Sequence, residues 1–226
     1  MRFKPILLIT MFLLAGLTPR ADAFILINEI LADPPSGIVG DANNDGETSS
    51  SQDEFVELFN AGPDAMDLSA WTLEDSLRIR HVFSEDSLMD SRGILVIFGG
   101  GTPQLSGIDW QLASSGALSL NNSSDTVILR DHDGNIIDQI GYSSEAGQDQ
   151  SLTRSPEGEL NPLIQHTLLD GADGLAYSAG FFVNPDESPA DTPEDPVVPE
   201  LSSFMYLSLG LLMLAKSRIT RIAGIF

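Results

Sequence analysis

The chain has 226 residues, with 11 basic and 33 acidic side chains, a formal net charge of −22 and no cysteine. The absence of cysteine excludes disulfides, thiol catalysis and cysteine metal sites, and so acidic a chain is repelled by phosphate backbones. Residues 24–200 hold 5 basic and 32 acidic residues, a formal net charge of −27, and no lysine. We therefore expect no nucleic-acid partner.

The N-terminus has the pattern of a secretory signal. Arg2 and Lys4 precede an apolar run from residue 6 to residue 17, and Ala21 and Ala23 occupy positions −3 and −1 of a signal-peptidase site. We expect residues 1–23 to be removed during export. A retained membrane anchor is the alternative, although the apolar run is short for a bilayer span.

Residues 24–185 predict one all-β domain. Short runs rich in Val, Ile and Phe alternate with Gly- and Asp-rich connections, and no helical period appears. Asp133-Gly134 predicts a hairpin, Trp71 and Trp110 are candidate core anchors, and residues 143–190 are expected to wrap the domain. These features favour an immunoglobulin-like β-sandwich. The predicted strands are 24–31, 54–60, 68–73, 79–83, 93–98, 126–131 and 136–142.

An acidic insertion, GDANNDGE at residues 40–47, separates the first two predicted strands. Asp41, Asn43 and Asp45 match the first, third and fifth positions of a D-x-[DN]-x-[DN]-G calcium loop, and Gly46 supplies its turn. Calcium takes six to eight oxygen ligands, which carboxylates, amides and backbone carbonyls provide. The insertion therefore predicts a calcium site.

The flanking residues show that this insertion is not an EF-hand. Gln52 stands at position twelve, where an EF-hand has a bidentate glutamate, and Pro34-Pro35 and the strand at 54–60 leave no room for flanking helices. An isolated calcium loop, closed by one of the acids that follow Gln52, is the prediction, and a solvated acidic loop is the alternative. The predicted ligands are Asp41, Asn43, Asp45, Glu47, Asp53 and Glu54.

A series of motifs runs in order through residues 24–160. They are INEI (27–30), EFVELFN (54–60), DLSAWTL (67–73), GILVIF (93–98), DTVILRD (125–131), GNIIDQIGY (134–142) and SLTRSPEG (151–158). The series resembles the lamin tail domain, an immunoglobulin-like β-sandwich of nuclear lamins and many exported bacterial proteins. The resemblance implies a non-enzymatic interaction module of the bacterial exported type, although a fold alone does not fix function.

The C-terminus predicts a linker followed by a membrane helix. Residues 186–200 form a Pro-rich acidic linker, and residues 201–215 are apolar, followed by Lys216, Arg218 and Arg221. The apolar run covers about 22 Å as a helix, less than the roughly 30 Å hydrocarbon core, so we expect local thinning or snorkelling of the basic side chains. The basic residues predict a cytoplasmic end and an exported domain. A buried core helix is the alternative.

The same tail has the three-part layout of a bacterial sorting signal. Pro199-Glu200-Leu201, the apolar run and the basic end resemble the PEP-CTERM signal of Gram-negative, matrix-forming bacteria. In that family a Pro-Glu-Pro tripeptide precedes a short membrane helix, and a membrane protease called exosortase acts near the tripeptide. Leu201 replaces the last proline of the tripeptide, and the basic end at residues 216–221 is sparse. The resemblance implies an exosortase-like processing enzyme as a partner, with a plain C-terminal anchor as the alternative.

Patterns typical of enzymes are weak in this chain. His81, His132 and His166 are isolated, no G-x-S-x-G elbow occurs, and the glycines at 99–101 lack the Lys-Ser/Thr of a phosphate loop. We expect a non-enzymatic module for the cell surface or extracellular matrix, anchored or sorted through residues 201–221 and stabilised by calcium. Its domain would lie in the periplasm or outside the cell.

Two other functions stay open from the sequence. A carbohydrate-binding module for exopolysaccharide requires an exposed aromatic platform, and an enzyme such as a hydrolase requires carboxylates gathered in a cleft. The partners we expect are therefore the membrane, the processing enzyme, and extracellular polysaccharide or surface proteins.

Overall fold

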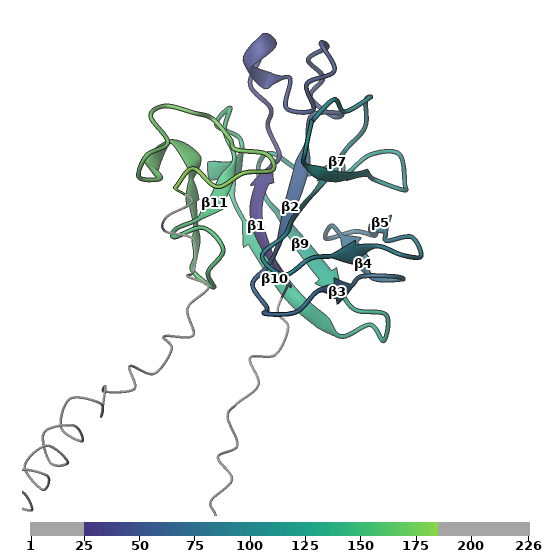
Figure 1. The fold of residues 1–226 in the computed structure, drawn as a ribbon. Helices are drawn as coiled ribbons and strands as arrows, with labels where there is room; N and C mark the ends of the chain where they lie inside the picture. Colours follow the sequence, from purple (N-terminus) through teal and green to yellow (C-terminus); the bar gives the residue numbers. More distant parts are fainter. Residues whose placement is uncertain (1–24, 185–226) are drawn as a thin grey trace, which may run out of the picture. The chain divides into compact units, whose positions relative to one another are not determined.

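The computed structural model describes residues 25–184, which form an all-β domain (Figure 1). These residues contain no α-helix, only three short 3-10 helices, η1 (Ile38–Gly40), η2 (Ser144–Ala146) and η3 (His166–Leu168). The strands are β1 (Ile25–Leu31), β2 (Phe55–Asn60), β3 (Met66–Asp67), β4 (Thr72–Glu74), β5 (Ile79–Val82), β6 (Leu88–Met89), β7 (Ile94–Phe98), β8 (Asp109–Leu112), β9 (Asp125–Arg130), β10 (Ile136–Tyr142), β11 (Leu152–Arg154) and β12 (Leu163–Gln165).

Two larger sheets and one small sheet make up the domain. The first sheet has the order β12-β11-β1-β2-β7-β8, the second has the order β10-β9-β4-β5, and β3 pairs with β6. All pairs are antiparallel except β7 with β8, which is parallel. The predicted all-β class is confirmed, and the two sheets packed face to face agree with the expected immunoglobulin-like sandwich.

The main core lies between the two large sheets. Ile25, Ile27 and Ile30 of β1 all belong to it, although strict alternation along a strand places only every second residue on one face. A β-bulge at Asn28 accounts for this spacing, because the register of β1 against β2 shifts between Ile27 and Glu29. The bulge therefore turns Ile30 inward and Glu29 to the outer face of the six-stranded sheet.

The outer face of the six-stranded sheet is also covered. Phe55 and Phe98 lie in a second apolar cluster with Leu31, Val96 and Ala179. Ala179 belongs to the segment that follows η3, so this late part of the chain packs over β1 and β2 (Figure 1). Because both faces are covered, every residue of β1 and β2 is buried. We call residues 151–184 the cover segment.

Most predicted strands are confirmed, and the differences have local causes. The hairpin at Gly134 is confirmed by its φ of +82° and by the Gly134 N–H bond to the Asp131 carbonyl. The strand predicted at 68–73 is wrong in its first half, because Asp67 caps a turn through the Ser69 N–H and Ala70 has φ +63°. Trp71 is a core residue, but Trp110 lies on edge strand β8 and is 37% exposed, which corrects its prediction as a core anchor.

The sequence patterns did not predict five strands. β3 and β6 have two residues each, β11 and β12 have three each, and β8 is an edge strand of mixed exposure. The segment predicted to wrap the sandwich therefore contributes β11 and β12 to the six-stranded sheet as well as covering it.

Both predicted membrane-related segments lie outside the described residues. They are the signal at residues 1–23 and the helix at residues 201–221, and the linker at 186–200 lies outside as well. Within residues 25–184, no helix has the length and apolar character that a membrane crossing requires.

Candidate functional site

The predicted calcium loop is closed by its own backbone. Both carboxylate oxygens of Asp41 accept backbone N–H groups, one from Asp45 at 3.0 Å and one from Gly46 at 2.9 Å. Asp45 in turn accepts from the N–H groups of Thr102 and Glu47, each at 2.9 Å, and these bonds lower its pKa. The loop thus has the tight turn that the sequence predicts, held by carboxylate-to-backbone bonds.

Asp53 lies beside this loop, as predicted. Its oxygens accept the Asn43 N–H at 3.1 Å and the Ser49 N–H at 2.7 Å, while the buried Asn43 amide donates to the Gly100 carbonyl at 3.3 Å. Burial, and to a smaller extent the negative charge of Asp41, raises the pKa of Asp53. The structure therefore brings together Asp41, Asn43, Asp45 and Asp53 of the predicted ligand set.

Glu54 does not join this group, whereas Glu47, predicted to contribute its backbone carbonyl, meets the group through its backbone N–H, which donates to Asp45. The Glu54 carboxylate accepts the Leu120 N–H at 3.3 Å, next to the core between the sheets, and burial raises its pKa to about 7. Glu47 is exposed at the end of the loop. The assignment of Glu54 as a closing ligand is therefore corrected: β2 begins at Phe55, and the strand directs the preceding side chain away from the loop.

Among residues 25–184, no three His, Asp or Glu side chains are arranged to hold a metal ion. The loop carboxylates accept backbone N–H groups instead of converging on one point. Calcium binding at this loop stays a prediction, and it would require carboxylates to turn from those donors toward the ion.

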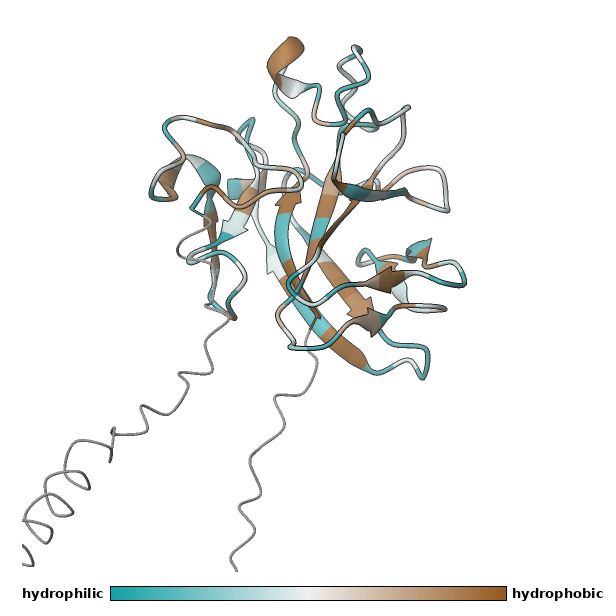
Figure 2. Cartoon of the chain, in the orientation of Figure 1, coloured by the Kyte–Doolittle hydropathy of each residue, from teal (hydrophilic) through white to brown (hydrophobic). Residues whose placement is uncertain are grey.

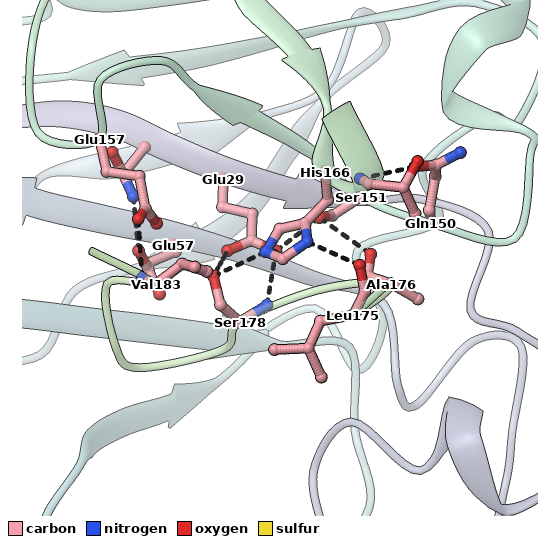
Figure 3. A network of polar contacts seen from close by, with 12 residues as sticks. Glu29, Glu57, Gln150, Ser151, Glu157, His166, Leu175, Ala176, Ser178 and Val183 are labelled. Atoms are coloured by element: carbon pink, nitrogen blue, oxygen red, sulfur yellow. Dashed lines mark hydrogen bonds and ion pairs between the residues drawn. The ribbon is translucent and has the colours of Figure 1, made fainter. Parts of the chain in front are cut away.

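A second acidic group, which the sequence analysis did not predict, lies under the cover segment (Figure 3). Glu29 of β1 and Glu57 of β2 are directly opposite each other in the strand register, and both are fully buried. Glu57 accepts the Asn28 amide at 2.8 Å and the Gly180 N–H at 2.8 Å. Burial, and then the nearby charge of Glu29, raises the pKa of Glu57 well above its ordinary value.

His166 is fully buried at the centre of this group (Figure 3). Its Nδ1 lies 2.9 Å from the Leu175 carbonyl, which only accepts, and its Nε2 lies 3.0 Å from the Ser178 hydroxyl. That hydroxyl donates to Glu29 at 2.8 Å. The Nε2 atom of His166 lies 4.0 Å from the Glu29 carboxylate.

Glu157 adds a third carboxyl group at the edge of the cluster. One of its oxygens accepts the Val183 N–H at 2.8 Å, and the other is buried without a hydrogen-bond partner. Burial first, and then the charge of Glu29, raises the pKa of Glu157 to about 7. A protonated carboxyl group is the form that this environment favours.

The serine, histidine and glutamate of this cluster differ from a catalytic triad in order and in access. In a triad the acid bonds Nδ1 of the histidine, whereas here Nδ1 bonds a backbone carbonyl and Glu29 accepts from the serine. Ser178 and His166 have no solvent-exposed surface. The cluster links the cover segment to β1 and β2 through hydrogen bonds.

A third feature is a groove of about 570 Å³ at the outer side of the cover segment. Its walls are mainly apolar and include Val39, Leu175, Tyr177 and Phe181, with one carboxylate, Asp149. It is the most apolar of the larger depressions described for residues 25–184.

Sequence reasoning missed the buried cluster, although part of its signal was present. The motifs INEI and EFVELFN place Glu29 and Glu57 inside strongly apolar strands, where a charge is unusual. Their burial depends on residues more than 90 positions later, such as Ser151 and Ser178. No local pattern shows that these segments meet.

Comparison with known proteins agrees with the order of motifs and with the sandwich. The model of the lamin tail domain family matches residues 18–144, which is more than half of the chain. No curated protein matches the chain. The match extends from β1 through β10 and includes the strands that carry Glu29 and Glu57. The chain belongs to the lamin tail domain family.

Proposed function

We propose that this protein is a non-enzymatic interaction module that acts outside the inner membrane, at the cell surface or in the extracellular matrix. The main support is the charge of its domain. Residues 25–184 contain 26 acidic side chains and five arginines. A domain with this imbalance attracts cationic groups, or carboxylate-bearing partners through divalent cations, and repels other anions.

The arginines do little to offset this charge at the surface, because four of them contact other residues of the domain. Arg80 forms a buried ion pair with Asp75. The three others are also engaged: Arg130 pairs with Glu74 at 3.1 Å, Arg154 with Asp138 at 2.7 Å, and Arg92 stacks over Phe59 at 4.7 Å.

Retention of the purified full chain on isolated extracellular matrix tests this proposal. We expect binding at low salt, weaker binding in 0.5 M NaCl as charges are screened, and stronger binding when calcium is added. Absence of retention under all three conditions would refute an interaction function of this kind.

The proposed route to that location uses both ends of the chain: a signal removed after Ala23 and a tail that an exosortase-like enzyme processes. Mass spectrometry of the mature protein tests both. We expect a new N-terminus at Phe24 and a C-terminus near Leu201, whereas an intact Phe226 in the membrane fraction would favour a plain anchor.

A carbohydrate-binding module is the second candidate, and the exposure of Trp110 favours it. Trp110 and Leu112 lie on the same face of edge strand β8 and are both partly exposed, so the indole ring is accessible to a sugar. A glycan-binding assay on the full chain, with and without calcium, separates this candidate from the first. Binding that disappears in Trp110→Ala would support it, and equal binding by that variant would contradict it.

A further inference from the structure

The apolar groove combines exposed apolar side chains with a fixed shape. Val39 is 64% exposed, Leu175 47% and Phe181 48%, and all three line the same depression. Exposed apolar side chains scattered over a surface need no explanation, but a set that lines one concave site is typical of a binding site. Figure 2 shows the apolar colour of η1, which contains Val39, at the edge of the domain.

The floor of the groove is anchored to the core. The Tyr177 hydroxyl donates to the Val39 carbonyl at 2.8 Å, so the two walls of the groove are joined directly. The Tyr177 ring meets Phe55 of β2 edge to face, with 6.0 Å between ring centroids. The groove is thus formed by the folded domain before a ligand arrives, which lowers the entropic cost of binding.

The one charged side chain that lines the groove is acidic. Asp149 lines it, and its backbone N–H bonds the Asp33 carboxylate at 3.4 Å, two residues before Pro35 of the groove wall. Asp173 precedes the lining residue Gly174. No lysine, arginine or histidine lines the groove. A ligand that is complementary to this site therefore has apolar groups for the walls and a cation for the rim.

We propose that this groove binds an extended peptide segment of a partner protein, with two or three apolar side chains next to a lysine or arginine. This inference rests on the proposed interaction function. The lining favours a peptide over a sugar because a sugar requires several polar partners. Asp149 is the only charged side chain in the lining, and the Tyr177 hydroxyl already bonds Val39.

The probe is a phage-displayed library of random 12-residue peptides selected on the full chain, after which the enriched peptides are synthesised with a fluorescent label. We expect enriched peptides to combine apolar residues with Lys or Arg. Leu175→Asp and Val39→Asp, at two exposed lining positions, are each expected to weaken binding at least about tenfold, since contacts at the centre of an interface dominate affinity. Asp149→Asn is expected to weaken binding about threefold and to reduce its salt dependence.

Two matched controls accompany these variants. Leu77→Asp places the same charge on a leucine that is 83% exposed and does not line the groove. Asp86→Asn removes an exposed carboxylate at φ +63°, close to the φ of +52° at Asp149. Both controls are expected to bind the peptides as the wild type does, and thermal melts verify that all variants fold.

Several outcomes would overturn the peptide proposal. They are the absence of any enriched peptide, enrichment of acidic peptides, equal binding by Leu175→Asp, and binding of neutral oligosaccharides that Leu175→Asp abolishes. Retention of Leu175→Asp on matrix at the wild-type level would refute the groove as the binding site and leave the interaction function intact. A wild type that binds the peptides but is never retained on matrix would refute the proposed interaction function and leave the groove as a peptide site.

Discussion

Glu29 and Glu57 show how a single pair of residues constrains this fold. Two carboxylates directly opposite each other on adjacent strands repel, and burial adds a large desolvation cost to each charge. The domain offsets this cost with backbone N–H groups, from Ser178 to Glu29 and from Gly180 to Glu57. The buried acids on β1 and β2 therefore take hydrogen-bond donors from the same cover segment that buries them.

The buried acids predict that stability falls as the pH rises. Burial raises the pKa of Glu54 and of Glu157 to about 7, and an unfolded chain has ordinary values near 4.5. Between these values the folded state binds more protons than the unfolded state, so the free energy of unfolding decreases from pH 5 to pH 8. Each group contributes on the order of 2 kcal/mol to this decrease. Urea unfolding across this pH range measures it.

Glu157→Gln and Glu54→Gln are expected to flatten that pH dependence, because an amide cannot ionise. Glu47→Gln, at an exposed position in the same domain, is the control and is expected to leave the profile unchanged. A wild-type domain that is equally stable at pH 5 and pH 8 would contradict the placement of these carboxyl groups in a buried environment.

The loop around Asp53 gives a separate prediction about calcium. A bound cation would offset the repulsion between Asp53 and Asp41, so we expect calcium to raise the melting temperature by a few degrees, in line with weak extracellular sites. NaCl at equal ionic strength serves as the control, because the anionic domain also gains stability from simple screening. Asp53→Asn is expected to abolish the part of the rise in melting temperature that calcium causes and NaCl does not. Equal melting temperatures in calcium, EDTA and NaCl would contradict calcium binding at this loop.

Among the strands, the sequence predicts those that a local pattern of apolar residues marks. The β10 range and the hairpin before it agree with prediction because alternating apolar residues and Asp133-Gly134 determine them nearby in the chain. The start of β4 was mistaken because Asp67 can bond the Ser69 N–H, which favours a turn over a strand. β11 and β12 are short, and no local pattern marks them: β11 pairs with β1, more than 120 residues earlier, and β12 pairs with β11.

In the candidate sites too, the sequence predicts the features that nearby residues determine and misses those that depend on distant residues. The turn at Asp41–Gly46 was predictable from side-chain spacing, whereas the direction of Glu54 depends on where β2 begins. The groove joins Val39 with residues near Tyr177, and this contact over 138 positions has no signal in a single sequence.

Arg154 hydrogen-bonds to three separate segments near the register irregularities in β1 and β10. Its guanidinium donates to the Ile27 carbonyl at 2.7 Å, to the Asn161 carbonyl at 2.6 Å and to Asp138 at 2.7 Å. Asp138 also accepts the Ile27 N–H at 2.8 Å, next to the irregularities in β1 and β10. One ion pair thus satisfies polar groups that the bulges leave without ladder partners.

Removing this arginine is expected to be costly. Arg154→Met leaves Asp138 buried without its cation, so we expect a loss of about 3–5 kcal/mol in the free energy of unfolding by urea denaturation. The double variant with Asp138→Asn is expected to recover about 1–3 kcal/mol, because asparagine still accepts from Ile27 without a charge. Arg78→Met, at an exposed position, is the control. If the losses of the single variants Arg154→Met and Asp138→Asn add up to the loss of the double variant, the pair is not coupled.

For the whole molecule, the family match and the folded domain end at different places. The match ends at residue 144, yet β11, β12 and the rest of the cover segment extend the structure to residue 184. β11 hydrogen-bonds to β1, and Ala179 packs in the outer apolar cluster. The part of the chain that the family model matches therefore depends on a later segment to cover the outer face of its sheet.

Truncation after Gly147 tests this dependence. The shorter chain would expose Glu29, Glu57 and Phe55 to water and leave β1 as an open edge, so we expect it to lose a cooperative unfolding transition. Domains of this size are stable by only about 5–15 kcal/mol, so the loss of a whole covering segment is large compared with that margin. A chain ending at Asn184, which keeps the whole cover segment, is the matched control and is expected to unfold cooperatively. Thermal melts followed by fluorescence of the buried Trp71 make the comparison, and a cooperative transition in the shorter chain would show that the lamin tail core is stable without its cover.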